Sequence, residues 1–233
     1  MVRVTGNFQS ESPLDPKAFE VLHAAFESGW ANPGKLSQSG ARAHQLRNQA
    51  LESIAASLGV AKDSILPFSS LSMGYFLGIQ GICDRSSTLI HGATDRKDVF
   101  AIAATMDHEI LPSDLHGKIL APKAQSPTSV LALHVANAET GVIQDCAEIV
   151  GRVNSDRVFL DATTSGIRKP ISCEYSTAIF DSRSWYGPAD IGFLVVNKAA
   201  QWHNPFPHLN AAKVNFDAPL PLIIASAVRS EEH

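Results

Sequence analysis

The sequence has few cysteines, little excess charge and no long hydrophobic run. Its three cysteines, Cys83, Cys146 and Cys173, are odd in number and form no CxxC pair, which excludes a disulfide framework and a cysteine-rich metal centre. The formal net charge is −4 with no Lys/Arg-dense stretch, which argues against nucleic acid as a partner. No apolar run approaches the roughly 20 residues of a membrane span, and the N-terminus lacks the apolar region of a signal peptide. We therefore expect a reduced, cytoplasmic protein with no membrane or nucleic-acid partner.

Metal-ligand patterns are also lacking. The nine histidines are scattered, and none shows the i, i+4 spacing beside a carboxylate that indicates a metal pair. We therefore expect no metal site. What the chain does have is 45% hydrophobic and 18% charged residues over 233 positions, which is typical of a folded globular protein rather than a disordered one.

Apolar spacing predicts helices and strands that alternate along the chain. The expected helices start at Pro16 after the N-cap Asp15, run from Leu46 to Leu58 with Gly59 just beyond, and cover Ser72–Cys83, Asp95–Met106, Cys146–Val153 and Ala218–Val228. The expected strands are Ser64–Phe68, Thr88–His91, Ser129–Val135, Arg157–Asp161, Thr177–Asp181 and Ile191–Asn197. This alternation predicts an α/β fold with three layers, α/β/α, around a mainly parallel sheet.

Four segments carry more specific information. They are Asn32-Pro33 with Leu36, Ser37 and Gly40, then residues 134–144 (HVANAETGVIQ), 159–164 (FLDATT) and 185–196 (WYGPADIGFLVV). Their order and spacing resemble the cysteine desulfurases, class V aminotransferases with the fold-type-I architecture of pyridoxal-phosphate (PLP) enzymes. The resemblance implies one large domain of that family over residues 1–233, with an N-terminal arm at 1–15 and a truncated exit segment and terminal helix at 203–233.

The sequence departs from the family where the chemistry is done. A PLP enzyme holds its cofactor as a Schiff base on a lysine, and alignment on Tyr186-Gly187-Pro188 puts Ser184 at that position. A serine hydroxyl cannot form an imine. Arg183 stands at the position of the family's phosphate-region histidine, and Ala138 replaces the second loop asparagine. We therefore expect no catalytic residue.

The resemblance still places a remnant of the cofactor pocket. Its expected members are Asp161, Ser72, Thr164, Asn137, Arg183 and Arg96. In the family the aspartate pairs with the pyridine nitrogen, and a buried carboxylate without a partner is costly. We therefore expect Asp161 to contact Arg96 or Arg183, or to face an emptied, wetter pocket. A plainer interpretation is a leftover carboxylate with a structural partner, beside loop-shaping residues such as Asn137 and Glu139.

The chain also ends where the family's smaller domain, with its sulfur-accepting cysteine and substrate-binding arginine, should begin. These departures favour a pseudoenzyme that does not bind PLP. We expect it to form a homodimer and to act with a protein partner in sulfur transfer or iron–sulfur assembly. One alternative is an active PLP-dependent desulfurase or aminotransferase-type enzyme that binds PLP non-covalently or uses Lys169 or Lys198. Another is a binder of a different small anion, held by Arg96 and Arg183. Four aromatic residues suggest either an interface patch or a cover over the core: Trp185, Trp202, Phe206 and Phe216.

Overall fold

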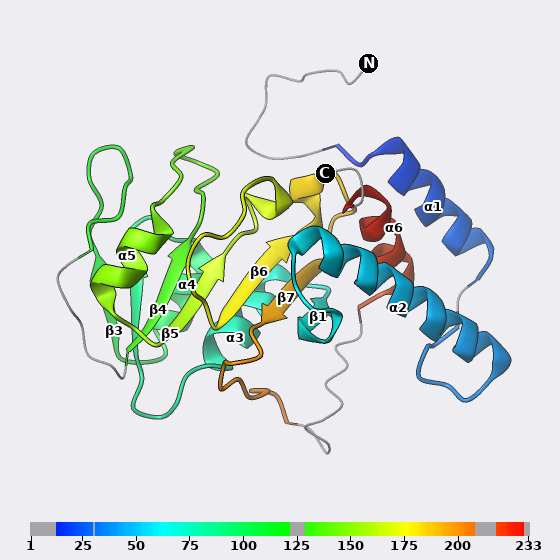
Figure 1. Ribbon diagram of the computed structural model, residues 1–233, viewed down its shortest axis with the longest axis horizontal. Helices are drawn as coiled ribbons and strands as arrows, with labels where there is room; N and C mark the ends of the chain where they lie inside the picture. Colours follow the sequence, from blue (N-terminus) through cyan, green and yellow to red (C-terminus); the bar gives the residue numbers. More distant parts are fainter. Residues whose placement is uncertain (1–12, 30, 122–128, 208–217, 231–233) are drawn as a thin grey trace.

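The computed structural model describes residues 13–29, 31–121, 129–207 and 218–230, and its centre is a seven-stranded sheet (Figure 1). The strands are β1 (Ile65–Phe68), β2 (Thr88–Gly92), β3 (His108–Leu111), β4 (Ser129–His134), β5 (Arg157–Asp161), β6 (Thr177–Asp181) and β7 (Gly192–Val196). Their order is β1-β7-β6-β5-β4-β2-β3. Strand β7 is antiparallel to both β1 and β6, and the other neighbours are parallel. The expected mainly parallel sheet is confirmed.

Helices cover both faces of this sheet. They are α1 (Pro16–Glu27), α2 (Gln38–Leu58), α3 (Leu71–Gln80), α4 (Lys97–Ala103), α5 (Cys146–Val153) and α6 (Leu220–Ser230), with short 3-10 turns η1 (Lys62–Ser64), η2 (Gly166–Arg168) and η3 (Ser182–Trp185). Successive residues of a strand face opposite sides. Leu131 of β4 therefore packs in a core with α2, α5 and α6, and Ala132 packs in a second core with α3 and α4. The three-layer prediction is confirmed, and α1 lies outside, against α6 (Figure 1).

The helix boundaries follow local capping chemistry. Asp15 accepts a hydrogen bond from the Lys17 backbone N–H at 2.8 Å, and Gly59 ends α2 in the left-handed region at φ +67°. Helix α2 begins a full eight residues before Leu46, because Ser37 Oγ accepts from the Gly40 N–H at 3.0 Å and caps it. Leu46 is 40% exposed, so its expected inward position is wrong.

Strand β3 is missing from the sequence prediction. Among the described strands it pairs only with β2, at the edge of the sheet, and the first three of its four residues are exposed. An edge strand with a solvated side lacks the apolar pattern that marks its buried neighbours. Within the described ranges, no helix is long and apolar enough to span a bilayer.

The four aromatic residues near the final crossover do not form one exposed patch. Trp185 is completely buried, and its Nε1 donates to the Ser226 carbonyl at 3.1 Å. Trp202 is half-buried and donates to the Leu77 carbonyl at 3.0 Å. Phe206 is 37% exposed, and Phe216 lies outside the described residues. Trp185 is thus part of the core.

Candidate functional site

A cavity of about 500 Å³ opens at the carboxyl ends of the parallel strands β2, β4 and β5. This edge is where open α/β sheets place their ligand sites. The lining includes five of the six residues expected from the sequence, namely Ser72, Arg96, Asn137, Asp161 and Thr164. It also includes residues that the sequence interpretation did not assign to the pocket: Thr94, Asp95, Lys97, Asp98, His134 and Glu139.

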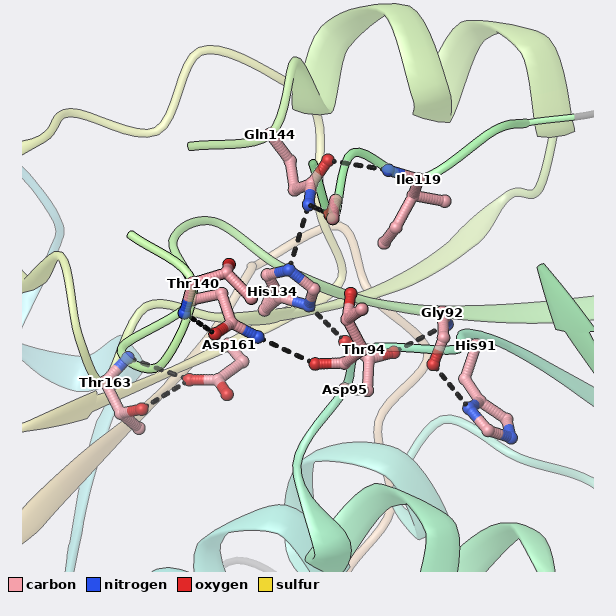
Figure 2. Close-up of polar contacts among 12 residues, drawn as sticks. His91, Gly92, Thr94, Asp95, Ile119, His134, Thr140, Gln144, Asp161 and Thr163 are labelled. Atoms are coloured by element: carbon pink, nitrogen blue, oxygen red, sulfur yellow. Dashed lines mark hydrogen bonds and ion pairs between the residues drawn. The ribbon is translucent and has the colours of Figure 1, made fainter. Parts of the chain in front are cut away.

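Asp161, at the end of β5, already has protein partners for both carboxylate oxygens. Its Oδ1 accepts from the Thr163 backbone N–H at 2.9 Å and from the Thr163 hydroxyl at 2.6 Å (Figure 2). Its Oδ2 accepts a short hydrogen bond from the Tyr75 hydroxyl. Arg96 donates to Thr163 Oγ1 at 2.9 Å. The expected direct contact with an arginine is therefore wrong for the described part of the chain, because Thr163 lies between the two charges.

Tyr75 and Arg96 keep the protonation states that stabilise the negative charge of Asp161. Burial raises the pKa of the Tyr75 phenol well above its ordinary value, and the negative charge of Asp161 raises it further. Burial opposes the charge on Arg96, but Tyr75 and Asp161 outweigh that effect and raise its pKa. The phenol stays a donor and the guanidinium stays charged, so the buried carboxylate is compensated from inside the protein.

Replacing Tyr75 with phenylalanine is expected to lower the free energy of unfolding by about 2 kcal/mol, because a buried carboxylate loses a donor. Above pH about 10 the unfolded tyrosine ionises before the folded one, so stability falls as pH rises, and Tyr75→Phe should show a shallower fall. Denaturant titrations at pH 7 to 11 measure both. Tyr175→Phe, at a half-buried site outside the cavity, is the control for the loss of stability at pH 7. Equal losses in the two variants at pH 7 would contradict the assigned role of Tyr75.

Arg183 and Ser184, in η3 just after β6, are engaged within their own turn. Arg183 Nε and Nη2 donate to Asp181 Oδ2 at 2.9 and 2.6 Å, and this pairing raises the pKa of Arg183. Ser184 is buried, and its hydroxyl donates to the Asp181 carbonyl at 2.7 Å. Gly166 of η2 packs so closely that a Cβ there would lie 2.0 Å from Ser184 Oγ. Neither Arg183 nor Ser184 is among the residues that line the cavity.

Ser72, in the first turn of α3, faces a carboxylate. Its hydroxyl donates to Asp98 Oδ1 at 2.5 Å, which joins the start of α3 to the start of α4. The resemblance places a phosphate group at this position, where a helix N-terminus favours an anion. Here the anion beside Ser72 is a side chain of the protein itself.

A second buried network, which the sequence interpretation missed, connects β2, β4 and the loop before α5 (Figure 2). His134 Nδ1 forms a short hydrogen bond with Asp95 Oδ1, and both side chains are at most 3% exposed. Asp95 Oδ2 accepts from the Gly92 N–H at 2.7 Å. Gln144 Nε2 lies 3.0 Å from His134 Nε2. His134 and Gln144 belong to a quoted motif, but nothing in the motif indicates Asp95 as the partner.

Asn137 shapes the loop that borders the cavity. Its Oδ1 accepts from the backbone N–H groups of Glu139 and Thr140, both at 2.9 Å, and its Nδ2 donates to the Thr94 carbonyl at 2.8 Å. All the polar atoms of this side chain are therefore used in holding the loop 137–141 against the end of β2.

Comparisons with known proteins give consistent relatives. No protein-family model matches the chain. The cysteine desulfurase IscS of Rickettsia bellii (strain OSU 85-389) is 26% identical over 211 residues, which cover 82% of this chain and 52% of that protein. IscS of Rickettsia prowazekii (strain Madrid E) is 26% identical over a 250-residue alignment covering 97% of this chain and 60% of that protein. The chain thus spans between half and two thirds of the length of these curated relatives.

Solved structures agree on the fold. A NifS-like protein superposes with a TM-score of 0.84 at 18% identity, covering 99% of this chain and 70% of that one. A structure of SspA in complex with cysteine superposes with a TM-score of 0.82 at 20% identity, covering 96% of this chain and 71% of that one. The chain is therefore similar in sequence to these cysteine desulfurases and has the same fold as the solved NifS-like and SspA structures.

Proposed function

We propose that this chain is a cysteine desulfurase-like pseudoenzyme, one large-domain unit without PLP Schiff-base or persulfide chemistry. Its role would be that of a protein partner or regulator in sulfur transfer and iron–sulfur assembly, as a cytoplasmic homodimer. The single observation that carries the loss of chemistry is the internal compensation of Asp161 by Tyr75, Thr163 and Arg96. The role in sulfur transfer is supported by kinship alone.

Three residues at the positions of the family's cofactor contacts do not fit PLP. Both oxygens of Asp161, which would pair with a pyridinium nitrogen, already accept hydrogen bonds from the protein. Ser72 donates to Asp98, so a carboxylate stands where a phosphate would need positive or neutral surroundings. At the lysine position, the buried hydroxyl of Ser184 is bound to a backbone carbonyl. These three departures concern the pyridine nitrogen, the phosphate and the Schiff base of PLP. Together they argue that the chain has not kept PLP binding.

The lysines named as substitutes for the missing one are poorly placed. Lys198 follows β7, which runs opposite to β6, so it lies at the amino-terminal ends of the parallel strands, away from the cavity. Lys169 is close enough to Cys146 to affect its thiol and does not line the cavity. Among the described residues, Lys97 is the lysine that lines the cavity. If a Schiff base formed, Lys97 is therefore where it would be found.

Incubation with PLP, followed by desalting, is expected to leave no absorbance band of an internal aldimine. Borohydride reduction and peptide mass spectrometry should then find no pyridoxyl lysine, and L-cysteine should yield no sulfide. IscS of R. bellii, treated in parallel, is the positive control. A stoichiometric pyridoxyl adduct on one lysine would overturn the proposal, and Lys97→Met would show whether that lysine is Lys97.

A second candidate function, binding of a different small anion, is favoured by Arg96 and Lys97 at the cavity wall. The carboxylates of Asp98 and Glu139 line the same cavity and would repel an anion, which weakens this second proposal. A saturable rise in Tm with a phosphate compound, abolished by Arg96→Met, would favour it over the pseudoenzyme without a ligand.

A further inference from the structure

His91, near the end of β2, is a completely buried histidine with one unused ring nitrogen. Its Nδ1 lies 3.1 Å from the Gly92 carbonyl oxygen, which can only accept, so the ring proton is on Nδ1 (Figure 2). Burial lowers the pKa of His91, which keeps the ring neutral and leaves a lone pair on Nε2. Nε2 is buried and has no hydrogen-bond partner among the described residues. Because a buried polar atom normally has a partner, this nitrogen is a candidate to bind a ligand from solution.

A second histidine lies beside His91 on the neighbouring strand. His108 begins β3 opposite Leu89 of β2, so His91 is two residues further along β2 and on the same face of the sheet. The two ring centroids are 5.9 Å apart, and the ring planes are inclined by 31°. His108 Nδ1 lies 3.2 Å from the Met106 carbonyl oxygen, so the neutral ring has its proton on Nδ1 and its lone pair on Nε2. The fold therefore brings together two imidazoles of the same tautomer.

We propose that His91 and His108 form a binding site for a divalent transition metal of the zinc type, which the two Nε2 atoms ligate. A neutral imidazole whose other nitrogen donates to a backbone carbonyl is a form in which histidine binds metals. Two nitrogens that ligate Zn²⁺ at the tetrahedral angle hold their ring centres roughly 5 Å apart, so the observed separation has to shrink by less than about 1 Å. His108 is exposed, so its ring can turn to bring Nε2 onto a metal held at His91.

The ligand set predicts a weak, exchangeable site with a preference for metals that bind nitrogen. Over the part of the chain that the structure describes, no third histidine, cysteine or carboxylate completes a cluster, so water fills the remaining positions. Imidazole ligands favour Zn²⁺, Cu²⁺ and Ni²⁺ over Mg²⁺ and Ca²⁺, which prefer oxygen. Sequence spacing does not indicate the pair, because strand register brings the two residues together. Neither histidine lines the cavity, so the inference stands or falls separately from the proposed function.

The test uses the untagged full chain, stripped of metal with EDTA and desalted. Titration with Zn²⁺ in competition with a chromophoric chelator should give one bound ion per chain. In the ¹⁵N spectrum of histidine-labelled protein, zinc should shift the Nε2 resonances of two of the nine histidines and leave their Nδ1 atoms protonated. Because the metal would join the edge strand β3 to β2, Tm should rise with zinc concentration and stay unchanged with Mg²⁺.

Variants make the assignment specific. His108→Gln removes the exposed ligand and should weaken zinc binding by at least about tenfold. His91→Gln should do the same, and because this buried variant could misfold, His108→Gln decides the outcome if it does. His44→Gln, at an exposed position of α2, is the matched control and should bind zinc as the wild type does. Undiminished zinc affinity in His108→Gln, zinc bound without a shift of any histidine Nε2, or no binding at millimolar zinc would each overturn the proposal.

Discussion

Replacing Trp185 with alanine is expected to lower the free energy of unfolding by about 4 kcal/mol, the range typical of a large aromatic side chain deleted from a core. The indole is completely buried and stacks on Phe193 of β7 with ring centroids 6.0 Å apart. Its Nε1 donates to the Ser226 carbonyl of α6. Deletion would leave a cavity between the sheet and the last helix and would remove the contact that holds η3 against α6.

Trp185→Phe separates packing from hydrogen bonding. It keeps most of the ring volume and loses the Nε1 donor, so we expect a loss of about 1–2 kcal/mol. Phe19→Ala, on the 56% exposed outer face of α1, controls for removal of an aromatic ring in general and should change stability by less than about 0.5 kcal/mol. Urea denaturation followed by circular dichroism measures all three. A Trp185→Ala loss no larger than that of Phe19→Ala would contradict the assigned core position.

The sheet shows how far sequence patterns reach. Strands such as β4 and β5 are fully or mostly buried apolar runs, so their positions follow from hydrophobicity, and helix ends follow from caps such as Asp15 and Gly59. The reversed direction of β7 does not follow, because it depends on contacts with β1 and β6 that no local pattern records. β3 is missed for the reason that edge strands are generally missed, namely its exposed residues.

The site was predicted residue by residue and not as a network. Asp161, Asn137, Ser72, Arg96 and Thr164 do converge on one cavity, because each lies at or near the end of an element whose position the alternating pattern predicts. The hydrogen-bond partners of these residues were not predicted. Tyr75 lies 86 positions before Asp161, inside a helix whose periodicity marks it only as buried. That it compensates the carboxylate depends on how α3 packs against the sheet, which is a tertiary contact.

The second prediction concerns the direction of the hydrogen bonds through His134. The Ile119 N–H donates to Gln144 Oε1 at 3.0 Å, and Gln144 Nε2 donates to the Gly117 carbonyl at 2.9 Å. These two backbone groups fix the orientation of the amide, so Gln144 Nε2 is also the donor to His134 Nε2. The imidazole proton is therefore on Nδ1, where it is donated to Asp95. The backbone groups of Gly117 and Ile119 thus set the donor-to-acceptor direction of the whole series of hydrogen bonds from Gln144 through His134 to Asp95.

Asp95→Asn keeps the shape of the side chain and conflicts with that polarity. One amide oxygen cannot take over both carboxylate contacts, to the Gly92 N–H and to His134 Nδ1–H, and the amide NH₂ would face another donor. The cost of leaving a buried donor unsatisfied, added to the loss of a charge-assisted hydrogen bond, predicts a decrease of about 3 kcal/mol in the free energy of unfolding.

The matched control for this replacement is Asp98→Asn, which makes the same chemical change only three positions along the chain. Asp98 accepts from the Ser72 hydroxyl at an exposed site, where an amide oxygen can accept equally, so its loss should stay below about 1 kcal/mol. Gln144→Glu probes the same network from its other end, because a carboxylate cannot donate to His134 Nε2 or to the Gly117 carbonyl. Denaturant midpoints for the three variants measure their losses of stability. If Asp95→Asn and Asp98→Asn were equally stable, the buried histidine would not have the fixed tautomer that these hydrogen bonds require.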